Sequence, residues 1–174
     1  MTKSRIIKIN PADTCNLKHI KTNLMANCPR YGYMNLNTFL ECRDNIYILV
    51  PYEDGIESVY SYSGITAIVG CRRTNIEKLG VKALEYYSQS NKVIYSIEFL
   101  HCQYIDSDKD VSGINQCMIQ ILLDACLKDK NDSFIVYKPD INTITNDEII
   151  ALIKSGFYRD KDDKTIFIRR PITQ

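Results

Sequence analysis

The sequence predicts one α/β domain over residues 1–174, built from a central sheet with helices on both faces. Segments with strand-like and helix-like patterns alternate along the chain, and a sheet covered by helices buries the apolar faces of both. The chain has 174 residues, of which 45% are hydrophobic and 25% are charged. That size and composition are typical of a single folded domain.

Charge and cysteine usage exclude several classes of protein. The net charge of +1 gives no overall basic field for nucleic acid. Seven cysteines without a CxxC pair and only two histidines indicate neither a disulfide framework nor a zinc or other metal site. No apolar run approaches the ~20 residues of a membrane span, and the first ten residues lack a signal-peptide core. We therefore expect a reducing, cytoplasmic location, which is the host cytoplasm if the chain is viral.

Strand and helix patterns can be assigned along most of the chain. Turn residues such as Asp54-Gly55 favour a hairpin, Arg72 to Thr74 is expected to be a polar link, and Gly80 weakens the helix around it. Strands rich in β-branched and aromatic residues are expected at 5–9, 45–52, 58–70, 92–105, 133–137, 157–159 and 164–169. Helices are expected at 14–26, about 37–42, 76–87, 113–125 and 146–155.

The chain is organised around the segment in which a strand ending at Ile105 leads through a polar loop to Gly113 and a helix. The first amides of a helix lack partners and carry positive partial charge, so a loop entering such a helix can hold a phosphate. A glycine there lets a ligand approach the backbone closely. The alternative is an ordinary strand-to-helix turn that contains a glycine.

This segment resembles motif A of the GNAT acetyltransferase superfamily, where the loop reads R/Q-x-x-G-x-G/A. The spacing from Ile105 to Gly113 matches, and so does the isoleucine that follows, whereas Asp110 and Asn115 depart from the pattern. A paired hairpin before this motif and the closing sequence 152–157 (LIKSGF), which is similar to Y-x-K-x-GF, extend the resemblance along the chain. The resemblance implies a mixed, mostly antiparallel sheet of about six to seven strands.

The same resemblance implies acetyl-CoA as co-substrate. The motif positions that would bind acetyl-CoA are Gln103, Tyr104, Ile105, Asp110, Val111, Ser112, Gly113, Ile114 and Asn115.

Three side chains are candidates for the acid–base chemistry of acetyl transfer. His101 lies four residues before Ile105, where the family often places a catalytic Glu or His, and its pKa is naturally near neutral pH. Glu98 would share its face if a β-bulge shifted the alternation. Tyr158 is a substitute for the family's tyrosine acid, whose position is Leu152 here.

Each candidate also has a purely structural interpretation. His101 would then be hydrogen-bonded within the sheet, Glu98 would form an ion pair, and Tyr158 or Tyr137 would belong to the core or surface. Tyrosines near residues 31–62 would either line an acceptor pocket, where rings attract cations, or pack along amphipathic strands.

The sequence therefore favours an acetyl-CoA-dependent N-acetyltransferase that acts on a primary amine of a small molecule or protein. The alternative is a catalytically degenerate GNAT-like binding protein, motivated by Asp110, Asn115 and Leu152. A nucleic-acid-binding domain using Arg72, Arg73, Arg169 and Arg170 is a third interpretation. We expect acetyl-CoA and an amine as partners, no membrane and no nucleic acid; the sequence leaves a homodimer open.

Overall fold

A computed structural model describes residues 3–32, 34–52, 65–80, 82–85, 93–102 and 112–172. The strands are β1 (Lys3–Lys8), β2 (Ile46–Tyr52), β3 (Ala67–Thr74), β4 (Ile94–Cys102), β5 (Phe134–Tyr137), β6 (Tyr158–Arg159) and β7 (Phe167–Arg169). The α-helices are α1 (Thr14–Asn27), α2 (Leu36–Glu41), α3 (Ile76–Leu79), α4 (Lys82–Glu85), α5 (Ser112–Leu127) and α6 (Asn146–Lys154). Two 3₁₀ turns, η1 (Pro29–Tyr31) and η2 (Arg43–Asn45), precede and follow α2.

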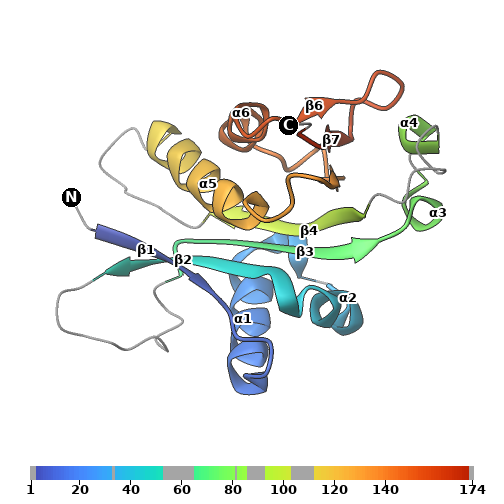
Figure 1. The fold of residues 1–174 in the computed structure, drawn as a ribbon. Coiled ribbons are helices and arrows are strands. Elements are labelled where there is room, and N and C mark those ends of the chain that lie inside the picture. The colour runs from blue at the N-terminus through green and yellow to red at the C-terminus, as the bar shows by residue number, and fades with distance from the viewer. Residues whose placement is uncertain are drawn as a thin grey trace.

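The described strands form one seven-stranded sheet in the order β1-β2-β3-β4-β5-β7-β6. Among these described strands only the β4–β5 pair is parallel, and the other pairs are antiparallel. Helices α1 and α2 cover one face, and α5 and α6 cover the other (Figure 1). The predicted mixed, mostly antiparallel sheet with helices on both faces is confirmed.

Two hydrophobic clusters fill the space between the sheet and its two helical layers. One cluster lies on the α1–α2 face of the sheet and contains Leu17, Ile20 and Leu24 of α1 and Phe39 of α2. On the other face α5 and α6 pack against residues of β2, β3, β4, β5 and β7. Both layers therefore reach β4, which lies in the middle of the sheet.

Two predicted elements around β3 are wrong. Arg72, Arg73 and Thr74 are not a link, because β3 continues through them and pairs with β4, with Arg72 opposite Ser96. The single helix expected at 76–87 is instead α3 followed by α4, since Gly80 adopts a φ of 60° that a helix does not allow. The hairpin turn predicted at residues 53–55 lies outside the described residues.

Gly70 of β3 lies directly under the Phe99 ring of β4, and an added Cβ atom would overlap that ring. Phe99 cannot move aside easily, since it stacks on Phe39 with centroids 5.5 Å apart. We expect Gly70→Ala to lower the free energy of unfolding by about 1–3 kcal/mol, measured by urea unfolding. Gly113→Ala is the matched control, because a Cβ there meets no atom within 4 Å; equal losses in both variants would contradict this packing.

Candidate functional site

The parallel strands β4 and β5 pair over only part of the length of β4. Their register runs from Ile94 opposite Phe134 to Ile97 opposite Tyr137, where β5 ends. β4 continues to Cys102. Residues 98–102 therefore present an edge that β5 does not pair, and the sheet is split at this point.

A β-bulge in β4 determines which side chains point to which face. Gly70 pairs with Phe99 while the next residue, Cys71, pairs with Ile97, so Glu98 is the extra residue. Ile97 and Leu100 pack in the α5–α6 core, whereas Phe99 packs in the α1–α2 core. The bulge brings Glu98 to the α1–α2 face, which alternation assigns to Phe99 and His101 as well.

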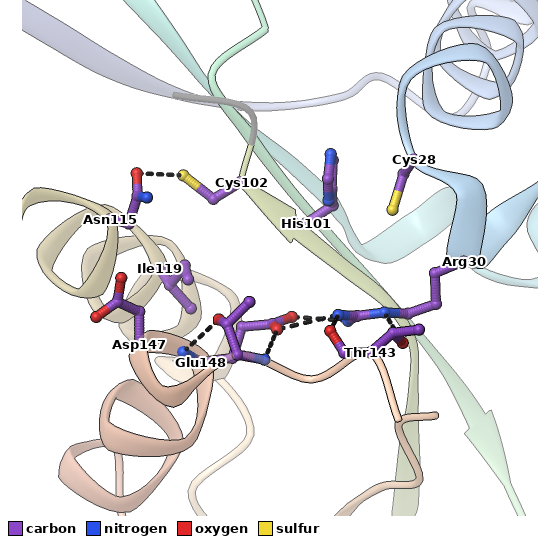
Figure 2. Close-up of a pocket in the computed structure, with 10 residues that line it drawn as sticks. Cys28, Arg30, His101, Cys102, Asn115, Ile119, Thr143, Asp147 and Glu148 are labelled. Atoms are coloured by element: carbon purple, nitrogen blue, oxygen red, sulfur yellow. Dashed lines mark hydrogen bonds and ion pairs between the residues drawn. The ribbon is translucent and has the colours of Figure 1, made fainter. Parts of the chain in front are cut away.

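A cavity of about 330 Å³ opens at the split, which is a typical size for a small-molecule site. Its walls come from the end of α1, from η1, from β4, and from α5 and α6 on the opposite helical layer (Figure 2). The cavity therefore connects the two faces of the sheet through the gap beside β4. The lining residues are Cys28, Arg30, His101, Cys102, Asn115, Ile119, Thr143, Thr145, Asp147 and Glu148.

His101 places a titratable imidazole ring in this cavity. Its Nε2 atom is buried and has no hydrogen-bond partner among the described residues. Burial lowers the pKa of His101, and the positive charge of Arg30 lowers it further. The imidazole is therefore neutral at neutral pH, which is the form that can accept a proton.

Arg30 and Glu148 form a buried ion pair that spans the cavity wall (Figure 2). Arg30 Nη1 donates to Glu148 Oε1 at 2.7 Å, and Nη2 donates to Oε2 at 3.1 Å. Arg30 Nε donates to Thr143 Oγ1 at 2.8 Å, and Nη2 also donates to Thr143 O at 2.6 Å. The remaining Nη1 contact, at 3.4 Å, is with Tyr137 Oη. These contacts use the five N–H groups of a guanidinium, so Arg30 is a structural clamp.

Local helix chemistry places Glu148 in that pair. Thr145 is the N-cap of α6, and its hydroxyl group accepts from the Glu148 amide while Glu148 Oε2 accepts from the Thr145 amide at 2.7 Å. This capping box fixes the carboxylate at the helix start. Burial lowers the pKa of Arg30, but the hydrogen bonds with Glu148 and the electrostatic interactions with Tyr137, Glu148 and Tyr31 together outweigh burial, so its pKa is raised overall and it stays charged.

The start of α5 provides the opposite wall of the cavity. Asn115 Oδ1 accepts a hydrogen bond from Cys102 Sγ at 3.5 Å, and both residues line the cavity. The position of Gly113 is open, since no atom lies within 4 Å of a Cβ built there. Ser112 begins the helix and Ile114 is partly exposed.

The other predicted acetyl-CoA contacts lie outside the described residues; they are Gln103, Tyr104, Ile105, Asp110 and Val111.

The two other predicted acid–base residues lie away from this cavity. Glu98 accepts from Arg72 Nε at 2.7 Å, and Arg72 also pairs with Glu41. Glu98 lines a second cavity of about 270 Å³ on the α1–α2 face, which shares Arg30 with the first. Tyr158 lies on edge strand β6, where its hydroxyl group accepts from Arg170 Nε at 3.0 Å, and it does not line the first cavity.

The sequence interpretation missed the Arg30–Glu148 pair. The capping pattern Thr145-x-x-Glu148 was visible in the sequence and would have placed Glu148 at a helix start. Nothing in the sequence pairs Arg30 with it, because the two residues are 118 positions apart.

Metal and membrane features are absent from the described part of the chain. Within it, no group of three or more His, Cys, Asp or Glu side chains is placed to hold a metal ion. The helices described there are too short or too polar to cross a membrane.

This fold, with its split between two parallel central strands, is that of the GNAT N-acetyltransferases. No protein-family model and no curated protein matches the chain by sequence. The assignment of the chain to this fold is therefore based only on the similarity of three-dimensional structures.

Three solved structures illustrate the similarity. A chain of the NatC complex bound to Gag peptide and CoA has a TM-score of 0.60 at 14% identity, over 98% of this chain and 99% of that one. Arabidopsis thaliana NAA60 in complex with acetyl-CoA has a TM-score of 0.58 at 11% identity, over 91% and 88%. Arylalkylamine N-acetyltransferase 2 from Aedes aegypti has a TM-score of 0.57 at 11% identity, over 98% and 100%.

Proposed function

We propose that this protein transfers an acetyl group from acetyl-CoA to a primary amine of a small molecule or protein. The observation that carries the proposal is the cavity at the β4–β5 split, which places His101 with a free, buried ring nitrogen beside the unpaired edge of β4. The similar structures support it, since they include N-acetyltransferases with CoA or acetyl-CoA bound.

The residues around the split fit acetyl-CoA as co-substrate. A Cβ built at Gly113, in the first turn of α5, meets no atom within 4 Å, and helix N-termini favour phosphate groups. Asn115 and Ile119 continue this wall into the cavity. We infer that the diphosphate binds at the start of α5 and that the thioester end lies in the split.

Acetyl transfer needs a base for the amine and hydrogen-bond donors for the thioester oxygen, and the site offers both. A neutral His101 accepts the proton that the amine loses as its nitrogen bonds to the thioester carbon. The C–S bond then breaks, and CoA leaves as a thiolate that takes a proton from water. Backbone N–H groups on the unpaired edge of β4, other than that of Leu100, which donates to Tyr31 Oη, are the donors available to the thioester oxygen. Arg30 takes no part as a free cation, because Glu148 and Thr143 occupy its donors.

The direct test is to incubate the protein with acetyl-CoA and a panel of primary amines and peptides, and to detect acetylated product by mass spectrometry. We expect at least one acceptor to gain an acetyl group in proportion to the free CoA released. Binding of acetyl-CoA without any product across a broad panel would refute catalysis.

A non-catalytic GNAT-like binding protein is the second candidate. The specific observation is that Leu152, at the family's tyrosine-acid position, is fully buried in the core and carries no proton to donate. The Asn115 side chain also lies in the cavity where the family has Gly or Ala. The same incubation separates the two candidates, because only the enzyme yields product.

A further inference from the structure

A tyrosine hydroxyl group occupies the edge of β4 beside the split. The Leu100 N–H donates to Tyr31 Oη at 2.9 Å, and Tyr31 Oη donates to Leu100 O at 3.1 Å. Backbone groups on this edge would pair with β5 if the parallel ladder continued, but the ladder stops at Ile97 and Tyr137. One side chain therefore satisfies both backbone groups of a fully buried strand residue.

The Tyr31 hydroxyl group is part of a chain of hydrogen bonds in which the donor of each bond can be assigned. Arg30 Nη1 lies 3.4 Å from Tyr137 Oη, which lies 3.3 Å from Tyr31 Oη. Arginine only donates and the Leu100 carbonyl only accepts. Tyr137 therefore donates to Tyr31, and Tyr31 donates to Leu100. This assignment gives Tyr31 two accepted bonds and one donated bond, which is the full capacity of a hydroxyl group.

Packing also holds the aromatic ring of Tyr31 in place. Tyr31 is 8% exposed, and its ring meets Phe99 edge-to-face with centroids 6.4 Å apart at 76°. Arg30, the preceding residue, is clamped on Glu148 of α6. Burial raises the pKa of Tyr31, so the hydroxyl proton that reaches Leu100 is retained at physiological pH.

We propose that Tyr31 is the positioning residue of the split: its hydroxyl group replaces β5 as the partner of β4 and holds the Leu100–His101 edge in place. Tyr31 and Arg30 both line the second cavity, and Arg30 lines the first as well. Tyr31 therefore acts at the boundary between the two cavities. The consequence for catalysis rests on the proposed function, whereas the structural role does not.

Amide hydrogen exchange in the unmodified protein tests the structural role first. The Leu100 amide lies on an edge that β5 does not pair, so without Tyr31 it would exchange rapidly. We expect the Leu100 amide to exchange as slowly as amides inside the β3–β4 ladder. Fast exchange of the Leu100 amide in the folded protein overturns the proposal.

Tyr31→Phe removes the hydroxyl group and keeps the ring. We expect exchange of the Leu100 amide to accelerate about 10- to 100-fold more than that of other core amides, because two buried backbone groups lose their partner. Tyr137→Phe is the matched control, since it removes a neighbouring buried hydroxyl group but leaves both Leu100 bonds in place; there we expect Leu100 to stay protected. Equal acceleration in both variants, or none in Tyr31→Phe, overturns the proposal.

The His101 ring gives a second readout that needs no activity. The chain has only two histidines, and His19 is exposed, so the NMR signals of the His101 ring are easily assigned. In Tyr31→Phe we expect the pKa of His101 to move back toward 6.5 as β4 shifts and water enters. The charged and titratable groups that line the cavity with His101 are Cys28, Arg30, Cys102, Asp147 and Glu148.

Kinetics then test the role in transfer. If the protein is an acetyltransferase, Tyr31→Phe should lower kcat about 10-fold or more through misplacement of His101, while KM for acetyl-CoA changes less than about 3-fold because the start of α5 is untouched. An unchanged kcat with an exposed Leu100 amide overturns the catalytic part. Absence of acetylation by the unmodified protein refutes the proposed function alone, because the exchange result stands without it.

Discussion

Arg30→Ala is expected to lower the free energy of unfolding by about 3–5 kcal/mol, because it leaves a carboxylate buried without its partner. The side chains of Arg30 and Glu148 are only 10% and 5% exposed. The loss should be among the largest of any single substitution in this chain, since the pair joins η1 to α6 across the split. Urea unfolding measures it.

Arg72→Ala is the matched control for this prediction. Arg72 also bridges carboxylates, Glu98 and Glu41, but its side chain is 26% exposed and that of Glu41 is 53% exposed. Exposed pairs contribute at most about 1 kcal/mol. Losses of similar size in Arg30→Ala and Arg72→Ala would show that the Arg30–Glu148 pair is not the buried clamp described above.

His101→Ala is expected to lower the rate of acetyl transfer about 10²- to 10⁴-fold while leaving acetyl-CoA affinity nearly unchanged. The reason is that His101 supplies the free nitrogen in the cavity, whereas the phosphate groups are assigned to the start of α5. Steady-state kinetics and calorimetry on the same variant separate the two quantities. His19→Ala, in the exposed part of α1, should keep full activity; equal turnover in His101→Ala would exclude His101 as the base.

The stability of the protein should also depend on pH through His101. Its pKa in the folded chain is lowered from 6.5, chiefly by burial. The unfolded chain therefore binds the proton more readily, so the folded state loses stability as the pH falls below about 6.5. Urea unfolding at pH 5 and pH 7.5 should show a loss in the unmodified protein that shrinks in His101→Ala; identical losses would contradict the burial of this imidazole.

Local patterns along the sequence predicted most of the architecture. The helix expected at 14–26 is α1, and the Asp13 side chain caps its start. The expected GNAT-like sheet is present, and its central strand β4 carries Phe99 in the α1–α2 core. The predictions for Arg72 to Thr74 and for residues 76–87 were wrong. The first segment is a strand because of its long-range pairing with β4, and the second is divided by the backbone angle at Gly80.

The site was only partly predictable. His101 followed from its spacing, and Glu98 depended on a bulge that the register of β3 and β4 reveals. Arg30 and Tyr31 could not be found in the same way, since their partners Glu148 and Leu100 are distant in sequence. Those contacts exist only because the folded chain brings η1 across the split toward α6.

The measurement that tests the central claim most directly is a calorimetric titration of acetyl-CoA into the protein. We predict saturable binding to one site with a dissociation constant below about 1 mM. Asn115→Trp, which fills the cavity, should abolish the heat, whereas Ile150→Trp on the exposed face of α6 should not. No binding at millimolar acetyl-CoA, or undiminished binding by Asn115→Trp, would contradict the assignment of this split as an acetyl-CoA site.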